Sequence, residues 1–455
     1  MGVSSVSRPV RFLHTADLHL GIPLQGFSGA SRQIEAQLRE ASFVAWERIC
    51  DAALLHDVDF VLVAGDLYHR EARSIQAARC FEEQVQRLAE AGIAVFAVYG
   101  NHDPLGEREE LLDMPESFHA FPTEAPTFYE VTENGTPLAR IFGVSYRSRR
   151  ESRRLHAMLQ PSDDTLINIG ILHTALDPGN RNYSPCSMQD LLGQEYIHYW
   201  ALGHVHQPRV IKGGVPAIAY PGTPQGRHPG EAGVGGCLLV ELALDKVPDI
   251  KFLPISPFVW QKVELSIAEP REGAAIMNIS DLERLLQAKA EQVLEDPLAN
   301  IDMPELPLAD TGWKPEGYLV RWVLTGRGPA HALLTESEND LNELVDCMRD
   351  FQYRKPFLWT ESIQIQTASP LPEWESMLES WPLARQLEAI AGSCLEDEEM
   401  RSQLEKALGR IWDVNYDPEH PNETTLPATP EVLAAIVEQA KQLAYEKLLE
   451  GGRVP

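Results

Sequence analysis

The first 255 residues alternate short apolar runs with stretches of helical periodicity, and this alternation restricts the fold more than any other feature. Helical periodicity occupies residues 31–56 and 74–91, between the first three apolar runs. Strands that alternate with helices in this way predict a layered α/β fold in which helices cover the sheets. The apolar runs that we expect to form strands are residues 10–17, 59–66, 93–100, 139–146, 165–173, 199–204 and 236–244.

The chain has 455 residues, which is too long for one ordinary hydrophobic core, and its pattern changes twice. From residue 369 on, the pattern is helical, with amphipathic spacing at 374–381 and 433–444. Before that point, a strand, helix, strand, helix and strand are expected at residues 258–266, 280–295, 318–326, 334–350 and 359–367. We therefore predict three parts, which are residues 1–256, a small α/β domain at 257–368, and a helical region at 369–455.

Polar side chains that can bind a metal ion follow five of the expected strands. They are Asp17 and His19, then Asp66 and His69, then Asn101, His102 and Asp103, then His173, and finally His204 and His206. Each of these residues alone has an ordinary alternative as a helix cap, a turn residue or a buried histidine bonded to a carbonyl. Turn chemistry does not favour histidine repeatedly, however, and ligands bind at the carboxyl ends of strands in α/β sheets. We therefore predict that these side chains converge on one site.

The residue types indicate which metals such a site would bind. Two carboxylates, one amide oxygen and four imidazoles, without a thiolate, suit a pair of octahedral Mn²⁺ or Fe²⁺ ions better than a structural zinc ion. Asp66 follows the middle strand and is the natural candidate to bridge two ions. Paired ions stabilise both the attacking and the leaving oxygen of an in-line displacement at phosphorus. The six cysteines are scattered and form no CxxC pair, so we expect neither a zinc finger nor a disulfide framework.

The motifs D-x-H, G-D, G-N-H-D, H and G-H-x-H follow one another between residues 17 and 206, and this order resembles that of the calcineurin-like metallophosphoesterases. The stretches "HTADLHLG", "GDLYHR", "YWALGHVH" and "YPGTPQGRHPGE" further resemble the SbcD-like DNA repair exonucleases, closest to the YhaO-type branch. The resemblance implies a layered β-sandwich flanked by helices at 1–256 that carries the nuclease site. It also implies a capping domain at 257–368 that positions DNA, and a helical region at 369–455 that docks an ATPase.

The resemblance also implies a role for each residue of the site. The first metal ion would be held by Asp17, His19, Asp66 and His206, and the second by Asp66, Asn101, His173 and His204. His102 would protonate the leaving oxygen, and Asp103 would accept the other N–H of that imidazole. His69, Arg227 and His228 would lie near the phosphate. A surface histidine remains the alternative for His69, and a structural turn remains the alternative for the loop of Arg227 and His228.

Charge argues against a nucleic-acid partner at first sight, because the formal net charge is −28. Residues 1–256 carry 22 basic and 31 acidic residues (22 − 31 = −9), and the other 199 carry 17 and 36 (17 − 36 = −19). The exception is the arginine-rich segment "RSRRESRR" at residues 147–154. Its residues Arg147, Arg149 and Arg150 are candidates for contact with DNA, and a solvated loop is the alternative.

We expect a metal-dependent DNA nuclease with two Mn²⁺ or Fe²⁺ ions. The alternatives are a small-molecule or cyclic-nucleotide phosphodiesterase and a non-catalytic subunit of a repair complex. Expected partners are DNA, an SbcC- or YhaN-like ATPase with long coiled coils, and a second copy of the chain. No run approaches the roughly 18 apolar residues of a membrane span, and the first residues lack the apolar core of a secretory signal. We therefore expect a cytoplasmic protein without a membrane partner.

Overall fold

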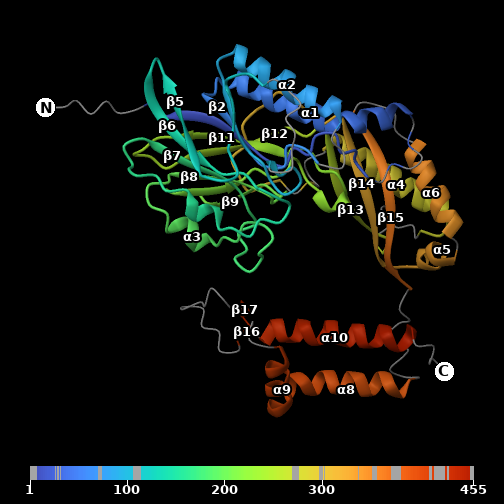
Figure 1. Cartoon of the computed structure of the whole chain (residues 1–455). Coiled ribbons are helices and arrows are strands. Elements are labelled where there is room, and N and C mark those ends of the chain that lie inside the picture. Colours follow the sequence, from blue (N-terminus) through green and yellow to red (C-terminus); the bar gives the residue numbers. More distant parts are fainter. Residues whose placement is uncertain are drawn as a thin grey trace. The chain divides into compact units, whose positions relative to one another are not determined.

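The computed structural model divides the chain into two compact units, Met1–Ala368 and Ser369–Pro455. Within the first unit lie two six-stranded sheets and one three-stranded sheet (Figure 1). The residues that the structure describes are 8–25, 27, 30, 32–69, 74–105, 114–268, 276–296, 301, 303–336, 338–350, 356–369, 381–408, 412–413, 426–427 and 430–450.

The first six-stranded sheet contains three of the strands that precede predicted site residues. Its order is β12 (Asp249–Pro254), β11 (Gly236–Leu242), β1 (Val10–Thr15), β2 (Phe60–Ala64), β3 (Ala94–Val98) and β4 (Phe118–Ala120). Strands β1 to β4 run parallel, whereas β11 is antiparallel to both β1 and β12. The carboxyl ends of β1, β2 and β3 therefore lie at the same edge of this sheet.

The second six-stranded sheet contains the other two such strands. Its order is β5 (Thr127–Glu133), β6 (Thr136–Gly143), β7 (Ile167–His173), β8 (Tyr199–Gly203), β10 (Ala217–Tyr220) and β9 (Arg209–Lys212). Strands β6, β7, β8 and β10 are parallel, and the two outermost strands are antiparallel to their neighbours. The two sheets pack face to face around one core, in which Phe12 contacts both Phe60 of the first sheet and Tyr199 of the second. The predicted layered α/β sandwich is confirmed.

Helices cover the outer faces of this sandwich. On the first sheet, α1 (Arg32–Leu55) and α2 (Ile75–Glu90) pack through a core that includes the stacked rings of Trp46 and Phe81. The outer face of the second sheet lies under the short helices η3 (Leu155–Met158) and α3 (Met188–Leu192), with Trp200 and Tyr146 in their core. A further turn, η4 (Pro229–Glu231), precedes β11.

The third sheet consists of three parallel strands, β13 (Phe258–Ser266), β14 (Gly317–Arg327) and β15 (Phe357–Ala368). Helices α4 (Ile279–Glu295), α5 (Ala330–Glu336) and α6 (Glu338–Asp350) accompany it. The residues Trp260, Leu319 and Trp359 of these strands pack against Ile34 and Leu38 at the start of α1. The third sheet thus shares a core with a helix of the sandwich.

The second unit contains α8 (Pro382–Glu396), α9 (Glu398–Leu408), α10 (Pro430–Glu450) and the strand pair β16 (Trp412–Asp413) and β17 (Leu426–Pro427). Trp381, immediately before α8, packs against Tyr445 of α10, and Lys441 of α10 pairs with Glu388 of α8. The amphipathic spacing predicted at 374–381 lies outside the described residues except for Trp381. In the described part of the chain, no helix is both long and apolar enough to cross a membrane.

The predicted strands and helices of the sandwich and the third sheet are present, with ends that differ by a few residues. The structure has α5 and α6 where we predicted one helix at 334–350, and α5 begins four residues earlier, directly after Pro329, which favours the start of a helix. Strands β4, β5, β9, β10 and β12 were not predicted, and four of the five have six residues or fewer. Such short runs carry little periodicity.

Candidate metal centre

The carboxyl ends of β1, β2 and β3 meet those of β7 and β8 at one edge of the sandwich. Asp17, His19, Asp66 and His204 follow these strands with φ values of 52°, 45°, 53° and 94°. Left-handed backbone at a residue other than glycine costs about 1–3 kcal/mol and concentrates at functional sites. Hydrogen bonds between neighbouring loops hold this backbone, because the N–H of Asp17 donates to Gly65 and that of His19 donates to Asp66.

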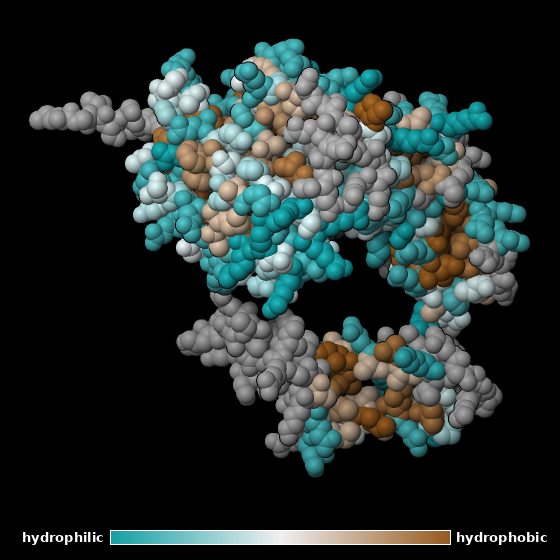
Figure 2. Space-filling view, in the orientation of Figure 1, coloured by the Kyte–Doolittle hydropathy of each residue, from teal (hydrophilic) through white to brown (hydrophobic). Residues whose placement is uncertain are grey.

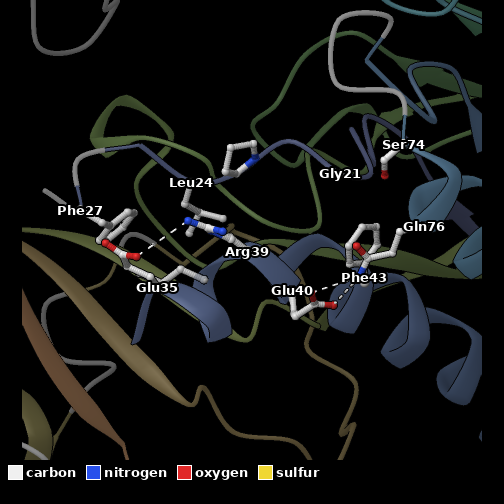
Figure 3. A pocket seen from close by; sticks show the side chains of 11 residues that line it. Gly21, Leu24, Phe27, Glu35, Arg39, Glu40, Phe43, Ser74 and Gln76 are labelled. Carbon is white, nitrogen blue, oxygen red and sulfur yellow. Dashed lines mark hydrogen bonds and ion pairs between the residues drawn. The ribbon is translucent and has the colours of Figure 1, made fainter. Parts of the chain in front are cut away.

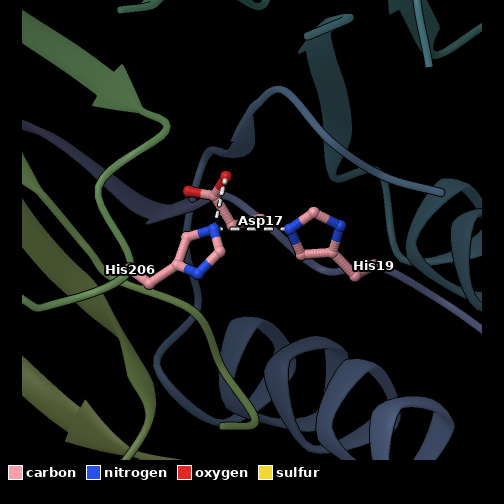
Figure 4. A group of neighbouring side chains, drawn as sticks. All are labelled: Asp17, His19 and His206. Carbon is pink, nitrogen blue, oxygen red and sulfur yellow. Dashed lines mark hydrogen bonds and ion pairs between the residues drawn. The ribbon is translucent and has the colours of Figure 1, made fainter. Parts of the chain in front are cut away.

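Asp17, His19 and His206 form the first cluster of possible ligands (Figure 4). The Nε2 atoms of His19 and His206 lie 3.4 Å apart, and Nε2 of His206 lies 3.7 Å from Oδ1 of Asp17. Asp17 is fully buried, and its Oδ1 has no hydrogen-bond partner among the described residues. A buried carboxylate oxygen without a partner is costly, so a cation between these atoms fits their chemistry.

The orientation of His206 is set by a residue that we did not predict. Oε1 of Glu231 lies 2.6 Å from Nδ1 of His206, which therefore carries the proton and leaves Nε2 with a lone pair. Burial lowers the pKa of His206, but the hydrogen bond and charge of Glu231 and the charge of Asp17 together outweigh it and raise the pKa. Burial likewise raises the pKa of Glu231, and the bonds from His206 and Arg227 outweigh it and hold that pKa below its usual range.

Asp66, Asn101, His173 and His204 form the second cluster. Nδ1 of His173 donates to the carbonyl of Ala64 at 2.9 Å, and its Nε2 lies 3.0 Å from Oδ1 of Asn101 and 3.4 Å from Oδ2 of Asp66. Nδ1 of His204 lies 3.1 Å from the same amide oxygen. Burial lowers the pKa of His173, but the charge and hydrogen bond of Asp66, the charge of Asp17 and the bond to Ala64 together outweigh it and raise the pKa to about 9. A positive charge is therefore favoured at this point, whether a proton or a metal ion supplies it.

Asp66 belongs to both clusters, as the sequence led us to expect of a bridging ligand. Its Oδ2 lies 3.9 Å from Nε2 of His19 and 3.4 Å from Nε2 of His173. Its Oδ1 accepts the backbone N–H of His102 at 2.9 Å. Seven predicted ligands thus lie together at one edge of the sandwich.

His102 lies beside this centre with its ring 5.1 Å from that of His19 and 4.3 Å from that of His69. Burial lowers the pKa of His102 to about 4, so the ring is neutral near pH 7. His69 is half-buried next to His102, with its ring 6.1 Å from that of His19, and its contact with a phosphate stays a prediction.

The predicted bond from the His102 ring to Asp103 is wrong. Both carboxylate oxygens of Asp103 accept backbone N–H groups, from Gly100 at 2.9 Å and from Leu67 and Tyr68 at 2.8 and 3.2 Å. Within the described ranges, no hydrogen bond joins Asp103 to the ring of His102. Adjacent residues on a turn point apart, so Asp103 ties the loop after β3 to the loop after β2.

The loop "PQGRH" reaches the centre through Arg227. Its guanidinium lies 2.9 Å from Oε1 of Glu231 and 3.3 Å from Nδ1 of His206, and its side chain is 15% exposed. His228 is 43% exposed and accepts the N–H of Gly230, which caps η4. Arg227 thus lies behind a possible ligand, and His228 has the structural-turn role that we left open.

The arginine-rich segment begins directly after Tyr146, whose ring lies 5.5 Å from that of His173. Arg147, Arg149 and Arg150 are exposed. The other two arginines of the segment pair with acidic residues: Arg153 bonds to Glu151 at 2.5 Å, and Arg154 pairs with Asp190. Arg147 also lies 3.4 Å from Glu124 at the surface. The segment therefore offers exposed positive charge next to the centre, although less than its composition implies.

Two further features lie outside this centre. A pocket of about 740 Å³ opens beside the loop after β1 and is lined by Leu24, Phe27 and Phe43 with three charged side chains, Glu35, Arg39 and Glu40 (Figure 3). It contains none of the predicted ligands. His156, Cys186 and Asp190 also lie close together, but the guanidinium of Arg154 already occupies Asp190.

Comparison with known proteins agrees with this geometry. Residues 10–208 match the family model described as calcineurin-like phosphoesterase. An uncharacterized metallophosphoesterase of Bacillus subtilis, YhaO, is 30% identical over 359 residues, which are 78% of this chain and 81% of that protein. The chain belongs to the calcineurin-like metallophosphoesterases. The predicted family is thus confirmed, and the fold family uses a site of two metal ions.

Two further relatives of this metallophosphoesterase have names that state a function. The DNA double-strand break repair protein Mre11 of Aeropyrum pernix is 28% identical, over 59% of this chain and 66% of that protein. The SbcD component of the nuclease SbcCD of Bacillus subtilis is 25% identical, over 57% of this chain and 71% of its own length.

Glu231 is a residue of this centre that sequence reasoning missed. It is the last residue of "YPGTPQGRHPGE", a stretch that we singled out for its resemblance, and it lies 25 positions after His206. A conspicuous acidic residue at the end of that stretch was the available signal. Its partner was not visible, because only the fold brings the two residues together.

Proposed function

We propose that this metallophosphoesterase is a DNA nuclease that hydrolyses phosphodiester bonds with two divalent metal ions, Mn²⁺ or alternatively Fe²⁺. The observation that carries the proposal is the convergence of buried acceptor atoms on shared points. Nε2 of His19 and Nε2 of His206 face each other at 3.4 Å beside a carboxylate oxygen without a partner among the described residues. A cation between these atoms would accept a lone pair from each nitrogen and balance the charge of the carboxylate.

The donor atoms fit two ions. We assign Asp17, His19, Asp66 and His206 to the first ion, and Asp66, Asn101, His173 and His204 to the second. All are oxygen or imidazole nitrogen donors, which suit Mn²⁺ and Fe²⁺. When bound, two such ions activate a water molecule and stabilise the phosphate oxygens.

The side chains of the chain itself do the rest of the chemistry. His102 lies next to the first cluster, where its ring would face the scissile phosphate and give a proton to the leaving oxygen. The ring is neutral in its buried position, and the negative charge of an arriving phosphate raises its pKa and favours the charged form. Asp66 holds the backbone of His102, and Asp103 holds the loop that carries it. His69, beside His102, would contact the phosphate.

The relatives support DNA as the substrate, because their names state a nuclease component and a double-strand break repair protein. Exposed Arg147, Arg149 and Arg150 next to the centre offer positive charge for the phosphate backbone. We propose residues 1–256 as the nuclease domain and residues 257–368 as the part that positions DNA.

We further propose that residues 369–455 dock an ATPase with long coiled coils. The helices of this unit expose Leu383, Ile390 and Leu443, and hydrophobic side chains gather on its surface in Figure 2. An amphipathic helix of a partner binds to such a surface. Deletion of residues 369–455 would then abolish co-purification with the ATPase and preserve cleavage by the first unit.

The test of catalysis uses the full chain with Mn²⁺ and two substrates, end-labelled DNA and bis-p-nitrophenyl phosphate. His102→Ala should lower the cleavage rate for DNA by about 10²–10⁴, which is the usual contribution of a general acid, and lower the rate for the small diester much less, because nitrophenolate leaves without a proton. Its matched control is His119→Ala, which removes another half-buried histidine, stacked between Phe96 and Tyr129 in β4. This control should retain activity.

The two substrates separate the alternatives. Cleavage of the small diester without cleavage of DNA would replace the nuclease by a small-molecule or cyclic-nucleotide phosphodiesterase. Cleavage of neither substrate by a chain that binds Mn²⁺ would indicate a non-catalytic subunit. Full activity of His102→Ala on DNA would remove that residue from the chemistry.

A further inference from the structure

The chain between β10 and β11 runs directly behind the first cluster of ligands. Thr223 in this segment touches both ends of the cluster, because its N–H donates to the carbonyl of His206 and its hydroxyl donates to the carbonyl of Asp17 at 2.9 Å. Eight residues later, Glu231 bonds to the ring of His206. One segment therefore contacts the backbone and the side chain of the same possible ligand.

Glu231 uses both of its carboxylate oxygens, and its side chain is 8% exposed. Oε1 accepts Nδ1–H of His206 at 2.6 Å and Nη2–H of Arg227 at 2.9 Å, while Oε2 accepts the backbone N–H of Arg227 at 2.7 Å. The guanidinium thus neutralises the carboxylate and fixes its position. The carboxylate in turn dictates which nitrogen of His206 carries the proton.

This choice matters because an imidazole binds a metal ion only through a nitrogen without a proton. With the proton held on Nδ1, the lone pair of Nε2 points to His19 at 3.4 Å and to Asp17 at 3.7 Å. Without Glu231, the ring can take the other tautomer or rotate away. A carboxylate behind a metal-binding histidine contributes about 10–100-fold to metal affinity in other proteins.

The third sheet holds this segment in place. The side-chain amide of Gln225 bonds to both backbone groups of Phe258 in β13, at 3.0 and 3.1 Å. Trp260 in the same strand donates its indole N–H to the carbonyl of Gly226 and accepts the N–H of Gly233 at its own carbonyl. Glu231 lies between these attachments, so β13 determines where its carboxylate stands.

We infer that Glu231 is a positioning residue that holds His206 in the tautomer and orientation required by the first metal ion, with β13 as its support. The inference rests on the proposed two-metal function. It makes a selective claim, since Glu231 touches a ligand of the first ion and none of Asn101, His173 or His204. Removing its charge should weaken one of two metal sites and leave the other unchanged.

Isothermal titration of Mn²⁺ into the metal-free full-length protein tests this claim. The wild type should bind two ions, and Glu231→Gln should bind one of the two about 10–100-fold more weakly. The control is Glu361→Gln, which neutralises another little-exposed carboxylate that bonds twice to an arginine, Arg321, in the third sheet. Both Mn²⁺ affinities should be unchanged in that control.

The outcomes are distinct. Two unchanged affinities in a folded Glu231→Gln variant would overturn the inference and leave the two-metal proposal intact. Equal weakening of both sites would also overturn it, because a general structural role predicts that result. Absence of Mn²⁺ binding by the wild type would overturn the proposed function itself. Thermal unfolding verifies that each variant is folded. If Glu231→Gln does not fold, Glu231→Asp replaces it, because the shorter side chain withdraws the carboxylate by one methylene. The expected loss of Mn²⁺ affinity at one site is the same.

Discussion

Gly100 offers a way to damage the candidate centre with one methyl group. It connects β3 to Asn101, and a Cβ atom at this position would overlap Oδ1 of Asp66 and lie 2.8 Å from Nε2 of His173. The φ angle of Gly100 is not in the left-handed region, so the backbone accepts alanine without strain. The substitution Gly100→Ala therefore tests whether Asp66 and His173 must keep their present positions, without a contribution from backbone strain.

The magnitude follows from the distances. A carbon atom contacts oxygen or nitrogen at about 3.3–3.6 Å, so the carboxylate, which the Cβ atom would overlap, must move by about 1.0–1.3 Å and the imidazole, at 2.8 Å, by about 0.5–0.8 Å. A misplacement of about 1 Å costs about 10²-fold in rate. We expect a loss of about 10²-fold in kcat and in Mn²⁺ affinity at the second site, which has both displaced side chains as ligands, and a smaller loss of affinity at the first site, which shares Asp66. Overpacking should lower the free energy of unfolding by about 1–3 kcal/mol, so the fold survives in a protein of ordinary stability.

Mn²⁺ titration and the cleavage rate of bis-p-nitrophenyl phosphate measure these losses, and urea unfolding measures the change in stability. The matched control is Gly213→Ala, because a Cβ atom at Gly213 meets nothing within 4 Å and its φ is also outside the left-handed region. Wild-type affinity and rate in a folded Gly100→Ala protein would refute the assignment of Asp66 and His173 as neighbouring ligands.

Three further predictions concern pH, salt and metal removal. His14 is buried between the sheets against Tyr199, and burial lowers its pKa to about 3 from the ordinary 6.5. Between these two pKa values the unfolded chain binds a proton that the folded chain does not. The free energy of unfolding should therefore fall by up to roughly 4–5 kcal/mol as pH drops from about 6.5 to about 3. Urea unfolding of His14→Gln should show a shallower fall over the same pH range. Replacing Arg149 and Arg150 by Gln should reduce the slope of log K for DNA binding against log salt by about 2, whereas Lys251→Gln on β12 should not change it. Removal of metal by EDTA should lower the midpoint of thermal unfolding. Adding Mn²⁺ at 100 times its Kd should restore about 2.7 kcal/mol of the free energy of unfolding for each site. A midpoint that does not change with Mn²⁺ would contradict metal binding by the folded state.

The succession of apolar runs, and the polar residues at their ends, was enough to predict most strands of the sandwich and the side chains that converge at the candidate centre. Asp17, Asp66 and His173 each follow an apolar run long enough to be read as a strand, and a residue that directly follows a parallel strand must lie at the edge where that strand ends. Strands of three or four residues at or near sheet edges, such as β4 and β9, escaped prediction. They are held by pairing with a neighbour, and their own periodicity is too short to detect.

Only the tertiary structure decided which atoms face one another. The contact of Asp66 with His173 requires one sheet to pack on the other, and the sequence contains no information about that distance in any short segment. Asp103 was expected to accept a hydrogen bond from the ring of His102, yet it accepts the backbone N–H of Leu67, 36 residues earlier in the chain. Glu231 reaches His206 because β13 holds the intervening loop. Residue types and their order were thus sufficient to predict which side chains converge at this edge, whereas hydrogen-bond partners depend on how distant segments pack.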